Sequence, residues 1–249
     1  MPMPIVTDAA LILQVYPYSE TSKILRLLTR GHGVRSAMAR GALRPRSRYG
    51  GVLEPFTQGM ATMFVKENRE LQTLSGFDLE RSRQRLGDDL IRFAAASLLA
   101  EVVLLAGSEA SDPALFDGVV RWLDRIESSD PVDVEASAVT AAWTLVGALG
   151  FAPELERCIR CGREPADDEP TRFDYAAGGV LCDACGAGAG VALPPHGRAA
   201  LAAMGRGDVV SLDRYTAYWT LLDRFLTYHV TEGRSLRSLA FLAEAVERR

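Results

Sequence analysis

The sequence predicts an α+β multidomain protein in which a small β domain is followed by an α-helical domain with a four-cysteine knuckle. Three observations predict this class. Residues 5–77 form short apolar segments separated by turn signals, the apolar period becomes helical from residue 80, and all four cysteines lie between residues 158 and 185. We therefore expect one domain at residues 1–80 and a second at residues 81–249, with the knuckle at about 155–190.

The first part of the chain reads as β structure. Residues 19–28 have a spacing that a helix could also use, but their place between two turn signals favours a strand. Five strands within about 75 residues leave no room for crossover helices, which predicts a small closed barrel or a sandwich. The expected strand segments are residues 5–16, 23–29, 34–41, 50–66 and 70–80.

The second part reads as helices with recognisable ends. Asp88 and Asp89 open an apolar run, where acidic groups suit the free N–H groups of a helix start. Asp112 and Pro113 open a second helix in the same way, and Gly150 is a plausible stop for a third. Further helices are expected at residues 194–207, 211–233 and 235–249, with a buried aromatic stripe at Tyr215, Tyr218, Trp219, Phe225 and Tyr228.

Charge is distributed unevenly along the chain. The whole sequence has a formal net charge of −4, yet residues 21–53 contain no acid and eight basic residues. Because this basic island carries +8, the remaining residues carry −12. Such an asymmetry indicates an anionic partner for the island or, as the alternative, a basic face that is simply solvated.

Composition and targeting signals point to a soluble cytoplasmic protein. Hydrophobic residues make up 48% and charged residues 24%, which is ordinary for a globular domain with a core. The N-terminus lacks the basic region of a secretory signal. The most apolar span, residues 93–106, is interrupted by Glu101 and is shorter than the roughly 20 residues of a membrane helix.

The four cysteines form two CxxC pairs separated by twenty residues. This arrangement is typical of a tetrahedral Zn²⁺ site, in which each pair directs two thiolates at one ion. Gly162 and Gly186 follow the pairs and would let the chain turn, so that backbone N–H groups face the sulfurs. An iron–sulfur cluster, two disulfides or a redox pair remain as alternatives. The expected ligands of one structural zinc ion per chain are Cys158, Cys161, Cys182 and Cys185.

The usual catalytic motifs do not occur in the sequence. There is no GxGxxG, P-loop, GxSxG or HExxH pattern, and the three histidines are scattered. His32 lies in a turn, where exposure is the simpler interpretation. With the thiols assigned to a metal, no cysteine nucleophile is left, and we expect a protein that is not an enzyme.

Several ordered motifs together resemble the RecO family of bacterial recombination mediators. They are YSETSKILRLLTRGHG, RGALRPRSRYGGVLEPFTQG and ELQTL in the first part, and LGFAPELERCIRCGR, GGVLCDAC and RSLRSLAFL later. The resemblance reaches from about residue 5 to about residue 243. It implies an N-terminal OB-fold, a helical C-terminal domain and, as in many members, a zinc knuckle.

The resemblance also implies a function. Members bind single- and double-stranded DNA, anneal complementary strands, associate with RecR and the single-stranded DNA-binding protein, and help load RecA in the bacterial cytoplasm at the nucleoid; no membrane is involved. The chain departs from the family in its use of Arg where Lys is common. Because some members lack the cysteines, the metal would support the fold and not the shared activity.

The residues themselves agree with a DNA-binding surface, because OB barrels bind single strands with a charged groove and stacking aromatic rings. Aromatic candidates are Tyr16, Tyr18, Tyr49, Phe56 and Phe64, of which we favour Tyr49 for its place in the basic loop, while arginines beside the cysteines (Arg157, Arg160 and Arg163) would extend the surface. The predicted DNA-binding set is Lys23, Arg35, Arg40, Arg44, Arg46, Arg48 and Tyr49. The alternative is a zinc-stabilised adaptor whose basic face binds an acidic protein.

Overall fold

The computed structural model describes residues 4–66, 69–231 and 233–248. The chain forms two compact units, Met1–Glu127 and Ser128–Arg249. Strands end at Arg81, close to where the sequence changes period, but the helices that follow belong to the same compact unit as the strands. The domain boundary expected at residue 80 therefore stays a prediction.

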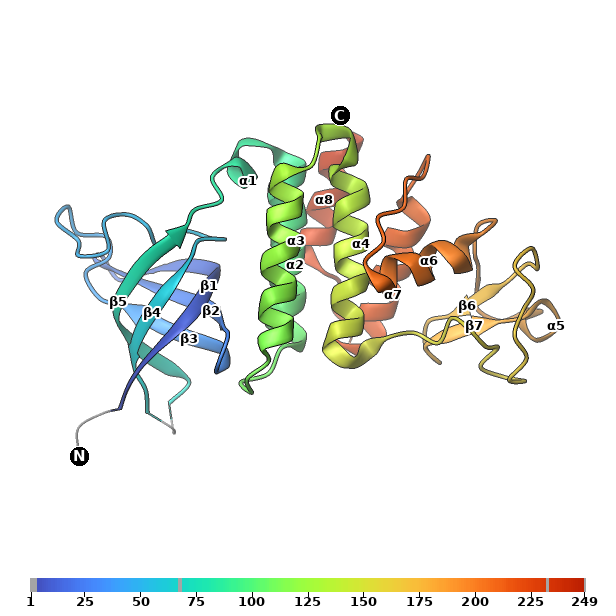
Figure 1. Ribbon diagram of the computed structural model, residues 1–249, viewed down its shortest axis with the longest axis horizontal. Helices are drawn as coiled ribbons and strands as arrows, with labels where there is room; N and C mark the ends of the chain where they lie inside the picture. Colours follow the sequence, from blue (N-terminus) through green and yellow to red (C-terminus); the bar gives the residue numbers. More distant parts are fainter. Residues whose placement is uncertain (1–3, 67–68, 232, 249) are drawn as a thin grey trace. The chain divides into compact units, whose positions relative to one another are not determined.

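The strands of the first unit close into a barrel of order β1-β2-β3-β5-β4 (Figure 1). All neighbouring pairs are antiparallel except β3 and β5. The sequence left open a closed barrel or a sandwich, and this OB-like barrel confirms the first. It also confirms a strand and not a helix in the segment of residues 19–28. The strands are β1 (Ile5–Tyr18), β2 (Ser22–Thr29), β3 (Gly33–Ala39), β4 (Gln58–Phe64) and β5 (Leu71–Arg81).

One expected strand starts later than predicted. Residues 50–57 form a loop, and β4 begins only at Gln58. Gly50, Gly51 and Phe56 have φ values of 57°, 80° and 67°, which an extended strand cannot accommodate. Apolar residues such as Leu53 and Phe56 made this segment resemble a strand in sequence. In the structure these two side chains are buried and anchor a loop.

Helices α1 (Arg85–Asp88), α2 (Leu90–Ala106) and α3 (Pro113–Ser128) follow the barrel. The predicted starts of the two longer helices are confirmed, because Asp89 Oδ1 accepts from Arg92 N and Asp112 Oδ1 from Leu115 N, each at 2.9 Å.

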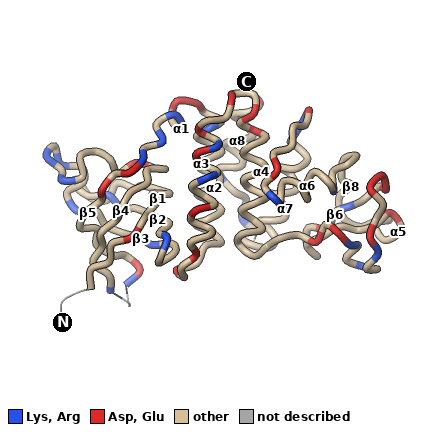
Figure 2. The backbone as a smooth tube through the Cα atoms, viewed as in Figure 1, with Lys and Arg blue, Asp and Glu red and all other residues tan. Residues whose placement is uncertain are grey.

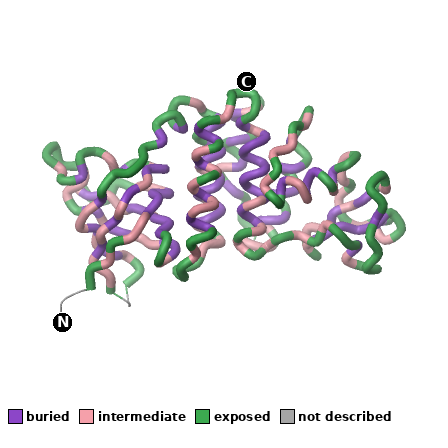
Figure 3. Tube along the Cα trace, in the orientation of Figure 1, coloured by how far each residue is buried: buried purple, intermediate pink, exposed green. Residues whose placement is uncertain are grey.

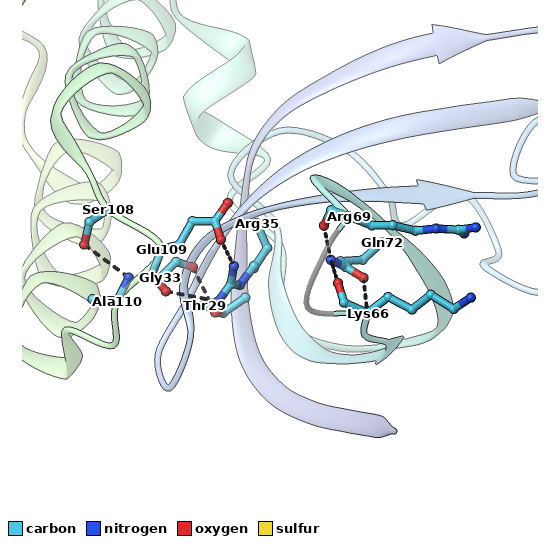
Figure 4. Close-up of polar contacts among 9 residues, drawn as sticks. All are labelled: Thr29, Gly33, Arg35, Lys66, Arg69, Gln72, Ser108, Glu109 and Ala110. Carbon is cyan, nitrogen blue, oxygen red and sulfur yellow. Dashed lines mark hydrogen bonds and ion pairs between the residues drawn. The ribbon is translucent and has the colours of Figure 1, made fainter. Parts of the chain in front are cut away.

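The loop between α2 and α3 is bonded to the start of β3, where Val34 N donates to Ser108 O at 2.9 Å. Gly33 at this point has φ +65°, and a Cβ on it would lie 2.3 Å from Ala110 O (Figure 4). Only glycine fits this close approach of two backbones.

The second unit is built around α4 (Val134–Val146), whose residues are almost all buried (Figure 3). Gly150 adopts φ +89° in the turn η2 (Gly147–Phe151), where the sequence predicted the helix to stop. Helix α7 begins at Thr216 and α8 at Arg237, a few residues after the serines expected to open them. The other helical elements are η1 (Pro131–Asp133), α6 (Gly197–Arg206), α7 (Thr216–His229) and α8 (Arg237–Glu247).

The knuckle lies between η2 and α6 and consists of small elements. A three-stranded sheet has the order β7-β6-β8, and in the second CxxC pair Cys182 is the N-cap of the short helix α5, which contains Cys185. Its elements are β6 (Arg172–Asp174), β7 (Gly179–Leu181), α5 (Asp183–Gly186) and β8 (Val191–Ala192).

The aromatic stripe on α7 is a core feature, as predicted, with one exception. Tyr218, Trp219 and Phe225 are buried, and so is Tyr215 just before the helix. Tyr228 is 59% exposed, although Leu226 in the same last turn is buried.

One helical stretch, Pro131–Phe151, is long and apolar enough to cross a bilayer by composition alone. The stretch is this long because η1, α4 and η2 follow one another without a break, whereas the sequence analysis expected only a helix that stops at Gly150. In its most apolar window 61% of the stretch is buried inside the fold, as is typical of the core helix of a folded domain.

Candidate nucleic-acid surface and candidate metal centre

The basic island divides into residues that are paired with acids and residues that are not. Lys23 belongs to the paired group: its Nζ lies 2.8 Å from Glu54 Oε1 and donates to Leu53 O at 3.0 Å. Its side chain is only 15% exposed. The structure thus gives Lys23 a role inside the fold, where its charge is already compensated, and disagrees with its expected place on an open DNA-binding surface.

Arg30 and Arg35 are paired as well, with acids that follow α2. Arg30 makes two bonds to Asp117, with Nε at 3.1 Å from Oδ1 and Nη2 at 2.8 Å from Oδ2. Through this hydrogen bond and its charge, Arg30 lowers the pKa of the Asp117 carboxyl. Arg35 forms an ion pair with the Glu109 carboxylate and donates to Glu109 O at 3.0 Å (Figure 4). Arg35 was predicted to bind DNA, but the structure commits it to the α2–α3 loop.

The remaining arginines of the predicted set lie in the loop of residues 40–51, which we call the basic loop (Figure 2). All four are exposed, and no acid lies within ion-pair distance of them in the described part of the chain. Arg48 donates to Ser75 O at 3.3 Å and lies 5.3 Å from the centre of the Tyr49 ring. These four uncompensated cations are Arg40, Arg44, Arg46 and Arg48.

Tyr49 anchors the basic loop and is not an exposed stacking platform. Its side chain is 3% exposed within the barrel core, and its hydroxyl donates to Leu74 O at 2.8 Å. Burial raises the pKa of the hydroxyl, although nearby Arg48 opposes this. In this structure Tyr49 therefore has no exposed ring face on which a base could stack, and its part in DNA binding stays a prediction. A loop of polar and basic residues needs an apolar anchor, and Tyr49 is its one aromatic ring.

The exposed aromatic rings are on β1 instead. Tyr16 and Tyr18 are 48% and 49% exposed, while Phe56 is buried and Phe64 is half-buried. Both tyrosines are on the outer face of the barrel, because Val15, the residue before Tyr16, packs against the core and side chains alternate along a strand. Their alternation with an inward residue is a signal that the sequence already contained.

A continuous outer face joins these rings to other side chains of β2 and β3. Tyr16 pairs with Ile24, and Ile24 pairs with Met38 on the next strand. In the adjacent row Arg26 pairs with Gln14 and Ser36; its Nε is buried and has no partner among the described residues. The basic loop begins beside this face, since Leu43 N donates to Thr21 O at 2.9 Å in the β1–β2 turn. We call this outer face, with Tyr16, Tyr18 and Arg26, the β1–β3 face.

The four cysteines meet at one point, and they are free thiols. Their Sγ atoms all lie within 4.8 Å of one another. The Sγ atoms of Cys161 and Cys182 are 3.8 Å apart, which is the edge of a tetrahedron with metal–sulfur bonds of about 2.3 Å, and far longer than a disulfide bond of about 2.05 Å. The cysteines are therefore positioned to hold a metal ion.

Backbone N–H groups face the sulfurs, as the glycines predicted. Burial opposes ionisation of Cys158, but N–H groups of Cys182, Cys161 and Arg160 outweigh it and lower the pKa of this thiol to about 6. Hydrogen bonding with Cys182 and Cys161 raises the pKa of Cys185 to about 12. Four thiolates this close need a cation between them to be negative together, which fits a metal-binding role.

The two glycines serve the centre in different ways. Gly162 has φ +73°, so it provides the turn that was expected, and its N donates to Cys158 O at 2.8 Å. Gly186 is helical, and a Cβ on it would lie 2.8 Å from Cδ of Arg172. It is therefore required for space and not for its conformational freedom.

Two of the three arginines expected to extend the surface near the cysteines, Arg160 and Arg163, make contacts within the knuckle. Arg160 Nη1 donates to Cys185 O at 2.6 Å, and Arg163 pairs with Glu169 through Nη1 at 2.8 Å and Nη2 at 2.6 Å. Arg172, which the sequence analysis did not single out, donates to Ala189 O and Gly190 O at 2.6 and 2.8 Å. These contacts speak against an open basic surface at Arg160 and Arg163.

The fold and the two sites define a class of protein: an OB-like barrel with an uncompensated cationic loop, joined to a helical unit with a tetrathiolate knuckle. The family model for the N-terminal part of recombination protein O matches residues 3–83, and that for its C-terminal part matches residues 87–240. The chain therefore belongs to the recombination protein O family, RecO.

Curated relatives agree with this membership. The chain is 35% identical over 187 residues to the DNA repair protein RecO of Anaeromyxobacter sp. (strain K), which covers 74% of this chain and 71% of that protein. It is 30% identical over 244 residues to the protein of the same name from Myxococcus xanthus, covering 95% and 96%. The Bacillus subtilis protein of that name is 31% identical over 176 residues, covering 70% and 66%.

Proposed function

We propose that this protein binds single- and double-stranded DNA through the basic loop and the adjoining β1–β3 face, and that it acts in DNA repair as its relatives' names state. The observation that carries the proposal is the set of four exposed arginines without acid partners, beside two half-exposed tyrosines. An uncompensated cation gains more from a phosphate than a paired one, because no existing ion pair has to be broken.

The two parts of the surface would contribute differently. The loop arginines neutralise phosphates of any sequence and release counterions, which makes affinity depend on salt. Tyr16 and Tyr18 supply ring faces on which unpaired bases stack, worth about 1–3 kcal/mol per base. Contacts to the backbone and to ring faces position a strand without reading its sequence.

Strand annealing follows from such a surface. Two complementary strands repel one another through their phosphates, and a cationic surface that holds both reduces this repulsion while the base edges stay free to pair. We infer that the protein anneals strands in this way. We also infer that, with RecR, it helps load RecA onto DNA coated by the single-stranded DNA-binding protein, as the family resemblance implies.

We assign one structural Zn²⁺ to Cys158, Cys161, Cys182 and Cys185. Four thiolates fill a tetrahedral site and leave no position for a substrate, so the ion would hold the knuckle together and take no part in a reaction. We infer accordingly that the protein works by binding and not as an enzyme. As a bacterial repair protein, it would act in the cytoplasm at the nucleoid and not at a membrane.

A salt titration with a charge-matched control tests the proposal. Single-stranded oligonucleotides of two unrelated sequences are titrated with wild type, with Arg44→Glu/Arg46→Glu/Arg48→Glu, and with a control that reverses three exposed arginines of the helical unit, Arg206, Arg214 and Arg224. With three to five phosphates neutralised, log K for wild type falls with log salt at a slope of about −2 to −3.5.

The loop variant should lose affinity for both sequences alike and flatten the slope by about 2, whereas the control should change little. Equal losses in both variants would mean that net charge and not the loop carries binding. Wild-type binding that is flat with salt would contradict the proposal. If the protein instead bound an acidic peptide but no oligonucleotide, the adaptor alternative would hold.

A further inference from the structure

The carboxylate of Glu169 connects the two halves of the knuckle. Oε1 accepts from Arg163 Nη2 at 2.6 Å and from Asp183 N at 3.0 Å. Oε2 accepts from Arg163 Nη1 at 2.8 Å and from Ala166 N at 3.2 Å. One side chain from the middle of the twenty-residue interval thus receives four N–H groups, and it is only 15% exposed.

Two of the residues that donate to Glu169 lie next to cysteines of different CxxC pairs. Arg163 is two residues after Cys161, and Asp183 directly follows Cys182. These two cysteines, one from each pair, are the ones whose sulfurs lie 3.8 Å apart. The carboxylate therefore braces the tetrahedron edge at which the two turns meet.

We propose that Glu169 is a positioning residue of the metal centre: with Arg163 it holds the two CxxC turns at the separation that a tetrahedral ion requires. This inference rests on the proposed structural zinc. Groups outside the ligand shell commonly fix the ligands of a metal, and their loss weakens metal affinity by about 10–100-fold. Here the fixed elements are the backbone after Cys182 and the side chain after Cys161.

Arg163 would also act on the charge of the centre. Its guanidinium lies on the residue two positions after the ligand Cys161. Four thiolates and one Zn²⁺ sum to a charge of −2, which a neighbouring guanidinium partly offsets. Hydrogen bonds from the Arg163 guanidinium and from Asp183 N lower the pKa of the Glu169 carboxyl to about 2. The carboxylate therefore stays charged at neutral pH.

Other acids of the interval do not occupy this position. Asp167 is 98% exposed on its side chain and pairs with Arg198. Glu164 is exposed and has no polar contact with the described residues. Glu164 is therefore a matched control: it carries the same side chain and charge, five residues away on the same interval.

The experiment uses the full-length protein, loaded with Zn²⁺ or Co²⁺. It measures the rate of zinc transfer to a colorimetric chelator in excess, and the absorption spectrum of the cobalt form. The variants are Glu169→Gln, Glu164→Gln, Arg163→Lys and the charge swap Arg163→Glu/Glu169→Arg.

Glu169→Gln should release zinc about 10–100-fold faster and shift the cobalt bands, because the amide cannot accept all four N–H groups. Glu164→Gln should match wild type, and Arg163→Lys should be intermediate. The charge swap should not restore retention, because arginine at 169 cannot accept from Asp183 N. A merely structural contact would leave the cobalt spectrum unchanged.

The outcomes separate this inference from the metal assignment. Wild type that binds zinc, with Glu169→Gln equal to it in release rate and cobalt spectrum, would overturn the positioning role alone. Wild type that takes up neither ion would overturn the metal assignment and the positioning role together. A charge swap that fully restores zinc retention would show that only the ion pair matters, which also overturns the proposed role of the Asp183 bond.

Discussion

The arginines of the basic loop and those of the knuckle both lie in turn-rich segments of the sequence. They differ in the groups that they contact. In the loop, Arg40, Arg44 and Arg46 are exposed with no acid partner among the described residues. In the knuckle, Arg163 is bound to Glu169, and Arg160 donates to Cys185 O. The comparison shows that an arginine near a site can serve a ligand or the fold, depending on whether its donors are already used.

The two segments also differ in how many acids lie close by in the sequence. No acid occurs between residues 21 and 53, whereas the interval between the CxxC pairs contains Glu164, Asp167, Asp168, Glu169 and Asp174. A knuckle with little apolar core needs polar contacts and metal to fold, so it uses its arginines for this purpose. The basic loop instead has an apolar anchor in Tyr49, which leaves its arginines free.

The largest expected effect comes from Cys182→Ser, which removes one ligand from the knuckle. Zinc content should fall from one ion per chain to well below one, and the knuckle should lose most of its order, because metal binding supplies its folding energy. Since the basic loop lies in the other unit, DNA affinity should stay within about 3-fold of wild type. Elemental analysis, calorimetry and an oligonucleotide titration measure the three quantities.

A loss of DNA affinity as large as that of the loop variant would show that the knuckle contributes directly to DNA binding, and would erase the contrast between the two regions. Unchanged zinc content would contradict the ligand assignment.

The next effect compares the two groups of arginines directly. Arg44→Glu/Arg46→Glu should weaken DNA binding about 10-fold or more at low salt and leave zinc retention unchanged, because each lost phosphate contact lowers the salt slope by about 0.7. Arg160→Glu/Arg163→Glu should instead weaken zinc retention and leave DNA binding unchanged. Oligonucleotide titration and zinc release, measured on both variants, give a two-by-two comparison. Knuckle reversals that weaken DNA binding equally would mean that Arg160 and Arg163 remain accessible to phosphates.

A smaller effect is expected from the exposed rings of the β1–β3 face. Tyr16→Ala and Tyr18→Ala should each weaken single-strand binding by about 1–3 kcal/mol, or about 5- to 150-fold, and affect duplex binding less. Stacking needs unpaired bases, whereas phosphate contacts serve both forms. Titrations with matched single- and double-stranded oligonucleotides measure the difference. If both tyrosine variants bind single strands as wild type does, the bases lie elsewhere.

The smallest effect is expected from Tyr49→Phe, which deletes only the hydroxyl that donates to Leu74 O. Stability should fall by about 1 kcal/mol, as for a typical buried hydrogen bond, and DNA binding should be unchanged. Denaturant unfolding and an oligonucleotide titration check the two expectations. If Tyr49→Phe lost much of its DNA affinity while its fold stayed stable, Tyr49 would have to contact DNA directly.

The sequence by itself determined the main architecture. The period of apolar residues predicted which segments form strands and helices, apart from the loop at residues 50–57, and Asp89 and Asp112 marked helix starts that the structure confirms. The spacing of Cys158, Cys161 and the second pair predicted one tetrathiolate centre. These features depend on residues close in the chain, so local patterns are sufficient to find them.

The tertiary structure alone decided which charges and rings are available. Lys23, Arg35 and Tyr49 lie in the right segment of sequence, but their partners are Glu54, Glu109 and Leu74, which are 25 to 74 residues away. Glu169 likewise gains its role only when two distant turns meet at its carboxylate. Availability depends on contacts between segments far apart in the chain, and local composition contains no record of those contacts.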